Sequence, residues 1–390
     1  MFKAERKLTE LIEKHLSILC FAAFSVLGFL IRLKGRHFLS SDMDVFLIPW
    51  FEDMQAAGGL KGLKEQIGDY NVLYQTVIAL MTYIPLNPMT MYKALSCGFD
   101  YLTALTAALL AAGLLEKPRF GTLFNSVYAV FLFLPTAVLN SAYWGQCDSM
   151  YAFCLLLALW LLWREKDLPS FILLGLAFAL KLQTVFVLPF YLAVYFVKKR
   201  FSLAMFLVSL ASFWLSGGVA YLFGRELLAP FRLYMEQTST YQSMWLCSRS
   251  FWQVFGNDYP EFGSFAILFA LSICGLGFYV ILARKKEIDT PSGYFSAAAW
   301  FVWVCIFFLP AMHERYAYFL DLLLVLLAFL DRRYIKFAAA SAFLSFMSYA
   351  PFLVHDNGLY REDAFIEFFI FVWFTHTVMT TPETKPKAAA

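Results

Sequence analysis

Long apolar runs, broken by short polar stretches, dominate the chain from residue 16 to residue 380. A helix needs about 20 mostly apolar residues to cross a bilayer, and about twelve segments approach or reach that length. Two of them are short and flank Lys181, which predicts either a tight hairpin or one broken helix. The pattern therefore predicts an all-α, polytopic transmembrane helical bundle. The segments are 16–33, 91–115, 120–139, 148–163, 168–180, 183–197, 201–223, 262–283, 292–310, 317–330, 334–354 and 363–380.

Basic residues give the expected orientation of these spans. Lysine and arginine concentrate in the cytoplasmic loops of membrane proteins. If all the basic clusters lie in the cytoplasm, the predicted spans alternate without conflict and both termini are cytoplasmic. The apolar run 70–86 could span or lie at the interface, and the charge bias favours the interface. The clusters lie within 3–14, 117–119, 164–166, 198–200, 284–286, 332–336 and 385–387.

The remaining loops are then expected at the outer face of the membrane. The first of these loops contains segment 43–67, which predicts an amphipathic helix lying on the membrane surface. No internal repeat and no separate soluble domain is evident in the sequence. We therefore expect one domain over residues 1–380 and a disordered tail over 381–390, where proline, lysine and alanine prevail.

Composition agrees with a membrane protein surrounded by lipids. Hydrophobic residues make up 61% of the 390 residues and charged residues only 15%, against about 25% charged in soluble domains. The formal net charge is +3, and its basic residues lie in short clusters, so we expect no nucleic-acid partner. The seven cysteines form no CxxC pair, which argues against a zinc site or a redox motif.

Ionisable residues are costly at membrane depth, so they are candidates for function. Asp42 and Asp44 follow the first span. In an extended segment both carboxylates would face one side, where they could act as a general base or share a divalent cation such as Mg²⁺ or Mn²⁺. The alternative is an acidic cap for the surface helix.

Two further polar motifs carry aromatic side chains. Asp69 and Tyr70 begin the run 70–86, where they could contact a carbohydrate or phosphate, or form an aromatic belt with a helix cap. A compact set between two spans combines flat rings with amide and carboxylate groups, which suits the binding of sugar hydroxyls. The alternative is that these residues form part of an aromatic belt at the membrane interface and a turn. This set consists of Tyr143, Trp144, Gln146 and Asp148.

The last two candidate functional groups contain basic side chains. Lys181, near Gln183, lies between two apolar segments and must find a partner, either a lipid phosphate or a structural carboxylate such as Asp100 or Asp148. His313, Glu314 and Arg315 are adjacent at a span boundary, where His313 and Arg315 could hold a phosphate leaving group. A solvated loop is the alternative. The loop 224–261 could add a lid through Arg232, Trp245, Arg249 and Trp252.

Taken in order, five motifs resemble those of the GT-C superfamily of membrane glycosyltransferases. The nearest similarity is to bacterial homologues of the GPI mannosyltransferases and of the lipid-linked glucosyltransferases of N-glycan assembly. The likeness covers roughly residues 16 to 330. The motifs are DMD at 42–44, GDYNVLY at 68–74, YWGQCDS at 143–149, LKLQ at 180–183 followed by Pro189, and LPAMHERY at 309–316.

The resemblance implies transfer of a hexose, mannose or glucose, from a polyprenyl-phosphate donor to a glycan or lipid acceptor at the outer face, with inversion. It implies that Asp44 or Asp42 is the catalytic base, with Asp44 slightly preferred. The cations Lys181, His313 and Arg315 would then stabilise the leaving phosphate. The remaining motif residues would contact the sugar or the acceptor: Asp69, Tyr70, Tyr143, Trp144, Gln146, Asp148, Gln183 and Glu314.

The chain departs from some family members because it has no large soluble domain, which leaves the acceptor open. We expect it in a bacterial plasma membrane, with an extracytoplasmic active site. The main alternative is a transporter or flippase for a lipid-linked saccharide. A transporter is expected to show internal repeats around a midplane site, whereas here the polar motifs collect at the predicted outer ends of spans.

Overall fold

The computed structural model describes residues 3–240, 242–246, 248–284, 288–353 and 360–380. The regular secondary structure of the described residues is helical apart from one pair of two-residue strands. It divides into two compact units, one formed by residues 1–180 and 216–226 and the other by residues 181–215 and 227–390. The predicted disordered tail, 381–390, lies outside the described residues.

Unit 1 holds the first eight α-helices and the short helix α11. They are α1 (Lys3–Lys34), α2 (Ile48–Ala56), α3 (Val72–Met81), α4 (Pro88–Leu114), α5 (Thr122–Phe133), α6 (Pro135–Val138), α7 (Asp148–Trp163), α8 (Asp167–Leu180) and α11 (Gly218–Leu222). Shorter turns join them: the 3-10 turns η1 (Gly35–His37) and η3 (Gly59–Lys64), and the π-helical turns η2 (Met43–Leu47) and η4 (Leu139–Trp144).

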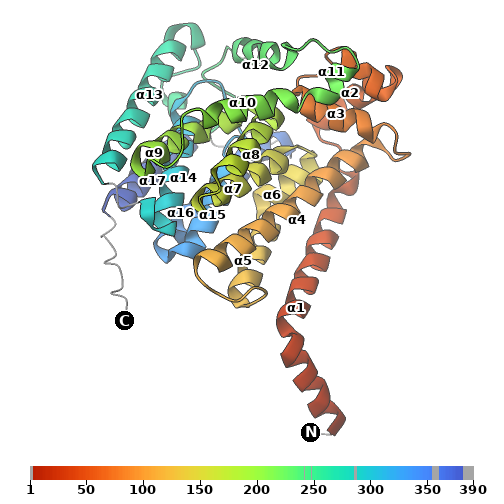
Figure 1. Ribbon diagram of the computed structural model, residues 1–390, viewed down its shortest axis with the longest axis vertical. Coiled ribbons are helices and arrows are strands. Elements are labelled where there is room, and N and C mark those ends of the chain that lie inside the picture. The colour runs from red at the N-terminus through yellow and green to blue at the C-terminus, as the bar shows by residue number, and fades with distance from the viewer. Residues whose placement is uncertain (1–2, 241, 247, 285–287, 354–359, 381–390) are drawn as a thin grey trace. The chain divides into compact units, whose positions relative to one another are not determined.

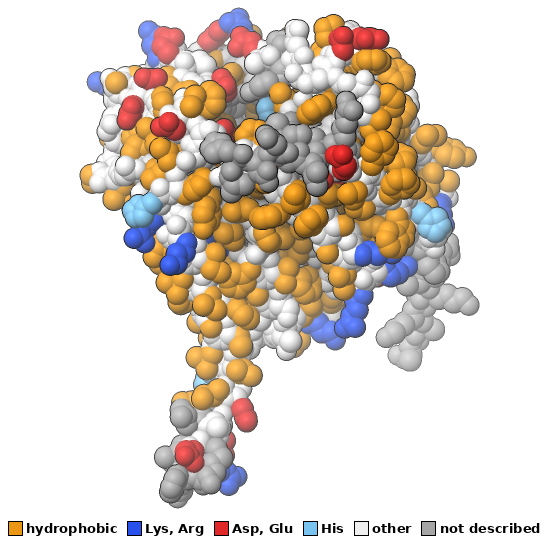
Figure 2. Space-filling view, turned by 180° about the vertical axis from the view of Figure 1, so that it is seen from behind, with side chains coloured by type: hydrophobic (Ala, Val, Ile, Leu, Met, Phe, Trp, Pro, Cys, Tyr) orange, Lys and Arg blue, Asp and Glu red, His pale blue; other side chains and the backbone are white. Residues whose placement is uncertain are grey.

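The long helix α4 is central to unit 1, since it packs against α5 and α7, and α7 packs in turn against α8 (Figure 1). Small residues such as Ala104, Ala107 and Ala111 are fully buried along α4, which lets neighbouring helices approach closely. By contrast, α1 leaves large apolar side chains exposed, including Val26 at 58% and Phe29 at 58%. Figure 2 shows hydrophobic side chains along this helix, as expected for a lipid-facing span.

Unit 2 holds the remaining elements. Its α-helices are α9 (Leu188–Lys198), α10 (Met205–Leu215), α12 (Ala229–Thr240), α13 (Tyr259–Ala283), α14 (Pro291–Phe308), α15 (Tyr318–Leu330), α16 (Ile335–Leu353) and α17 (Tyr360–Thr380). Its described residues also include the 3-10 turns η5 (Leu182–Val187), η6 (Phe251–Val254) and η8 (Arg332–Tyr334) and the strands β1 (Trp245–Leu246) and β2 (Met312–His313). Its core is α14, which is buried on every side from Tyr294 to Phe308 and contacts α13, α15 and α17.

The structure confirms helices that are long and apolar enough to span a membrane, whereas the expected total of about twelve spans stays a prediction. Among the described residues, 5 helices are long and apolar enough to cross a bilayer, or up to 6 if one bent pair counts as a span. The bent pair joins Thr122–Phe133 to Pro135–Trp144 at an angle of 49°. Its break coincides with Pro135, whose ring and missing N–H interrupt the helical hydrogen bonds.

Two expected segments differ from the structure, whereas the run 70–86 agrees with the favoured expectation that it does not span. Segment 201–223 is not one continuous helix, because α10 ends at Leu215 and α11 begins at Gly218 after two small residues. Segment 43–67 is not one surface helix but the succession of η2, α2 and η3, since Gly58, with φ of 88°, takes a left-handed conformation between α2 and η3. Within 70–86, α3 has 10 residues, about 15 Å, which is too short to cross a bilayer.

Candidate functional site

A polar cluster in unit 1 joins residues from three separated motifs. The Gln146 amide nitrogen donates to Oδ2 of Asp42 at 2.7 Å, and the Tyr70 hydroxyl donates to Oε1 of Gln146 at 3.0 Å. Gln146 is buried, whereas Asp42 and Tyr70 keep some exposed surface. The fixed amide therefore orients a carboxylate that solvent or a ligand can still reach. We call Asp42, Gln146 and Tyr70 the carboxylate cluster.

The two aspartates of the first motif do not face one side. Residues 41–50 are helical, with Asp42 entering the π-helical turn that contains Asp44. Helical residues two apart lie on nearly opposite faces, so the expectation based on an extended segment is wrong. Asp44 is exposed, while Asp42 takes part in the cluster. The capping alternative is also unsupported, because the Asp42 side chain makes no cap hydrogen bond at this turn.

The other residues of the 143–148 motif lie deeper. Trp144 and Asp148 are 0% exposed, and the Asn140 amide donates to Oδ2 of Asp148 at 3.0 Å. Tyr143 is half-buried, with its ring 5.6 Å from that of Phe38. Trp144 and Asp148 thus have no exposed surface to offer a sugar in this conformation, and they form the interior on which the cluster rests. The remaining unit 1 candidate, Asp69, is exposed.

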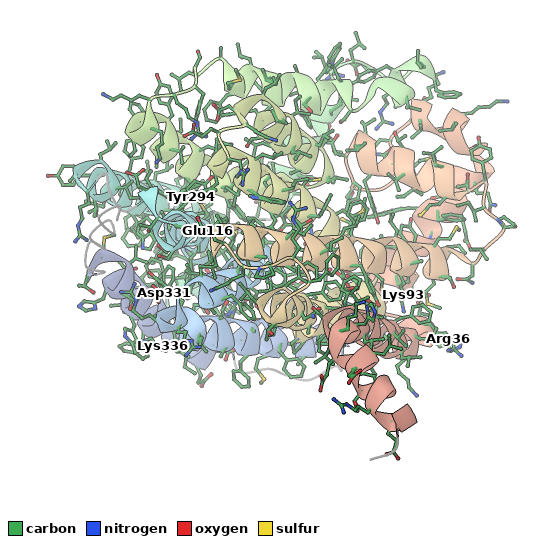
Figure 3. All side chains as sticks on the ribbon, turned by 60° about the horizontal axis from the view of Figure 1, so that its bottom comes forward. Arg36, Lys93, Glu116, Tyr294, Asp331 and Lys336 are labelled. Carbon is green, nitrogen blue, oxygen red and sulfur yellow. The ribbon has the colours of Figure 1, made fainter. Side chains whose placement is uncertain are left out.

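Helix α4 supports the cluster through two buried charges that the sequence reasoning missed as site components. The Lys93 ammonium is 5% exposed and donates to the carbonyl oxygens of Gly35 at 2.8 Å and of Phe38 at 2.5 Å. Figure 3 shows Lys93 near the end of α1, where Arg36 is also labelled. Lys93 therefore holds the backbone that leads from α1 to Asp42.

Asp100 lies two turns further along α4 and ties two more segments to that helix. Its Oδ2 accepts from Arg32 Nη2 at 2.8 Å and Arg32 Nε at 3.0 Å, and its Oδ1 accepts from the Ser141 hydroxyl at 2.8 Å. Arg32 is 5% exposed and Asp100 3%. The end of α1 and the turn before Gln146 are thereby fixed to the same helix. Isolated charges at 32, 93 and 100 inside apolar runs were the available signal.

In unit 2, the His313 motif forms a compact charged group. The Glu314 side chain, 2% exposed, lies 3.7 Å from His313 Nδ1 and 3.4 Å from Arg315 Nη1. Burial raises the pKa of Glu314, but the nearby His313 and the positive charge of Arg315 outweigh burial, so its pKa is lowered overall. Glu314 thus favours its ionised form and lies between His313 and Arg315, and the solvated-loop alternative does not fit its burial.

Lys181 lies where α8 ends, in extended backbone with φ of −157° and ψ of 133°, and η5 follows it. Lys181 and Gln183 are each 8% exposed. The Phe186 ring of η5 lies 6.3 Å from the Tyr316 ring, next to Arg315. The turn after Lys181 therefore packs beside the His313 motif within unit 2.

Arg249 and Trp252 do not form the exposed lid considered from the sequence, because they are only 5% and 2% exposed. No group of three or more His, Cys, Asp or Glu side chains that could hold a metal ion occurs among the described residues. A cation shared by Asp42 and Asp44 would need both carboxylates on one side, which the helical backbone does not provide.

The structure thus brings together two sets of predicted residues, one in each unit. That the carboxylate cluster and the His313 group act in one site stays a prediction. No model of a known protein family matches the chain, and no curated protein matches it.

Proposed function

We propose that this membrane protein transfers a hexose from a polyprenyl-phosphate donor to an acceptor hydroxyl, with Asp42 as the general base. The observation that carries the proposal is the carboxylate cluster: a half-exposed Asp42 oriented by the buried Gln146, which Tyr70 holds in turn. The order of the five motifs supports the choice of reaction through their resemblance to the GT-C glycosyltransferases. The proposed location is the outer face of a bacterial plasma membrane, with cytoplasmic termini.

Asp42 is better placed than Asp44 to act as the general base. One Asp42 oxygen accepts from Gln146 at 2.7 Å, which fixes the carboxylate without neutralising it. The acceptor hydroxyl would give its proton to Asp42 as its oxygen attacks the anomeric carbon of the sugar. The bond from that carbon to the phosphate oxygen would break, and the phosphate would leave with the bonding electrons. A positioned base contributes about 10²–10⁴-fold to such a step.

A leaving phosphate needs cationic partners, and His313 and Arg315, taken within unit 2 alone, are candidates for binding one. His313 and Arg315 each keep 17% of their side-chain surface exposed while facing the buried Glu314. Such a group could bind a phosphate with charge-assisted hydrogen bonds. Lys181 could add a further positive charge.

The test compares Asp42→Asn with Asp44→Asn, two isosteric changes two residues apart. The purified protein in lipid nanodiscs is assayed with radiolabelled polyprenyl-phosphate mannose and glucose and with lipid and glycan acceptors. We expect turnover to fall by about 10²–10⁴-fold for Asp42→Asn and to change little for Asp44→Asn.

A covalently glycosylated product separates transfer from transport, because a flippase moves the donor without breaking its sugar–phosphate bond. Full turnover in both variants, with unchanged thermal unfolding, would refute the base assignment. Loss in Asp44→Asn alone would move the role to Asp44.

A further inference from the structure

A strap of loop backbone in unit 2, residues 243–246 and 248–257, is joined to the segment that leads into His313. Its strand β1 pairs in parallel with β2, with Trp245 opposite Met312 and Leu246 opposite His313. The Ala311 amide donates to the carbonyl oxygens of Ser243 at 3.1 Å and Met244 at 3.0 Å. The conformation of the backbone before Glu314 therefore depends on where this strap lies.

Arg249 fastens the strap to the helices beneath it. Arg249 is 5% exposed, and its Nη1 donates to Oε2 of Glu367 at 2.9 Å and to the Ser341 carbonyl oxygen at 3.2 Å. Its Nη2 donates to the Ser345 hydroxyl at 3.0 Å. One side chain thus reaches α16 and α17 together.

Glu367 is itself held from the other side. Its Oε1 accepts from the Trp303 indole nitrogen at 2.5 Å, so α14 joins the same group. A second link follows along the strap, where the Trp252 indole nitrogen donates to the Phe308 carbonyl oxygen at 2.7 Å. The Asn257 side chain closes the loop by accepting from the Met244 amide at 2.6 Å. Three side chains of the strap make these contacts, Arg249, Trp252 and Asn257, and Arg249 is the charged one.

We infer that Arg249 is a positioning residue that acts through β1 to hold β2, and with it the His313–Glu314–Arg315 group, in one geometry. Arginine suits this place because its planar fork offers several donors in fixed directions, whereas lysine offers a single charged point. The phosphate ligand that we assign to the His313 group rests on the proposed function. The inference that the strap holds this group does not depend on that function.

The first measurement tests the strap alone, without substrate. Hydrogen–deuterium exchange is followed for peptides that cover 243–246 and 309–316 in the full-length protein in nanodiscs. In Arg249→Met, the link to α16 and α17 is lost, so we expect exchange at both peptides to quicken by about tenfold through local opening. Arg232→Met is the matched control, because Arg232 is an exposed arginine on the neighbouring α12, and it should leave both peptides unchanged.

Removing Arg249 alone leaves Glu367 facing no guanidinium, which could prevent folding. The double variant Arg249→Met/Glu367→Met also removes that carboxylate and carries the same expectation for exchange. Unchanged exchange at 309–316 in the variant that folds would overturn the inference, whatever the activity.

Activity forms the second arm. With a polyprenyl-phosphate sugar as donor, loosening the group expected to hold the phosphate should raise KM by about tenfold and affect kcat less. Faster exchange with an unchanged KM would uphold the role of Arg249 and count against the phosphate role of the His313 group. The two failures are therefore distinguishable.

Discussion

The buried pair of Arg32 and Asp100 permits a quantitative test of how unit 1 is held together. In Asp100→Asn the side chain keeps its size but loses its charge, so the Arg32 guanidinium, 5% exposed, faces no carboxylate there. Two hydrogen bonds, at 2.8 and 3.0 Å, change from charged to neutral acceptors. Breaking one partner of a buried ion pair costs about 3–5 kcal/mol, and we expect unfolding free energy to fall by that amount.

The assay is equilibrium or thermal unfolding in a fixed detergent, with a double variant as control. Arg32→Met/Asp100→Leu removes both charges together, and replacing a buried pair by apolar residues is often neutral or stabilising. We therefore expect the double variant to recover most of the lost stability. A loss below about 1 kcal/mol in Asp100→Asn, or a double variant no more stable than the single one, would refute the reasoning that this pair is buried and coupled.

Two further predictions concern the loops themselves. In Gly145→Ala, the added Cβ would lie 2.2 Å from Met43 Cε at a backbone φ of +75°, so we expect a loss of about 1–3 kcal/mol. Thermal unfolding checks this against Gly113→Ala, where nothing lies within 4 Å of the new atom, and equal midpoints for the two would contradict it. Because the pKa of Glu314 is lowered from its ordinary value of 4.5, its stabilising contribution is fully present above that value and is lost as pH falls through the folded-state pKa. The unfolding midpoint should therefore decline less steeply with acidification in Glu314→Gln than in the native chain, and parallel curves between about pH 6 and pH 3 would count against an ionised, paired Glu314.

Much of the helical fold could be predicted from hydrophobic runs alone. Segments 91–115, 148–163 and 262–283 match α4, α7 and α13 closely, because a long apolar run has few alternatives in a bilayer. Breaks were harder to predict. Two small residues, Ser216 and Gly217, separate α10 from α11 inside a run that reads as continuous.

The candidate site could be predicted as a set of residues but not as a geometry. Asp42, Tyr70 and Gln146 were each identified, yet their hydrogen bonds join positions up to 104 residues apart, which no local pattern encodes. Asp42 and Asp44 lie on opposite faces because the backbone there forms a π-helical turn, which the sequence pattern did not predict. Lys93 was overlooked because its partners are two backbone carbonyl oxygens, which the sequence does not identify, although a charge inside an apolar run marked the position.

The dependence of Arg32 on Asp100 also bears on the order in which the protein is made. Arg32 leaves the ribosome 68 residues before its carboxylate partner, so α1 must enter the membrane with an uncompensated charge near its carboxyl end. That charge favours a position at the lipid headgroups, where it stays hydrated. Only when α4 has been inserted can the guanidinium move against Asp100. Lys93 arrives on the same helix, so the segment that carries Asp42 acquires its final shape no earlier than that step of biogenesis.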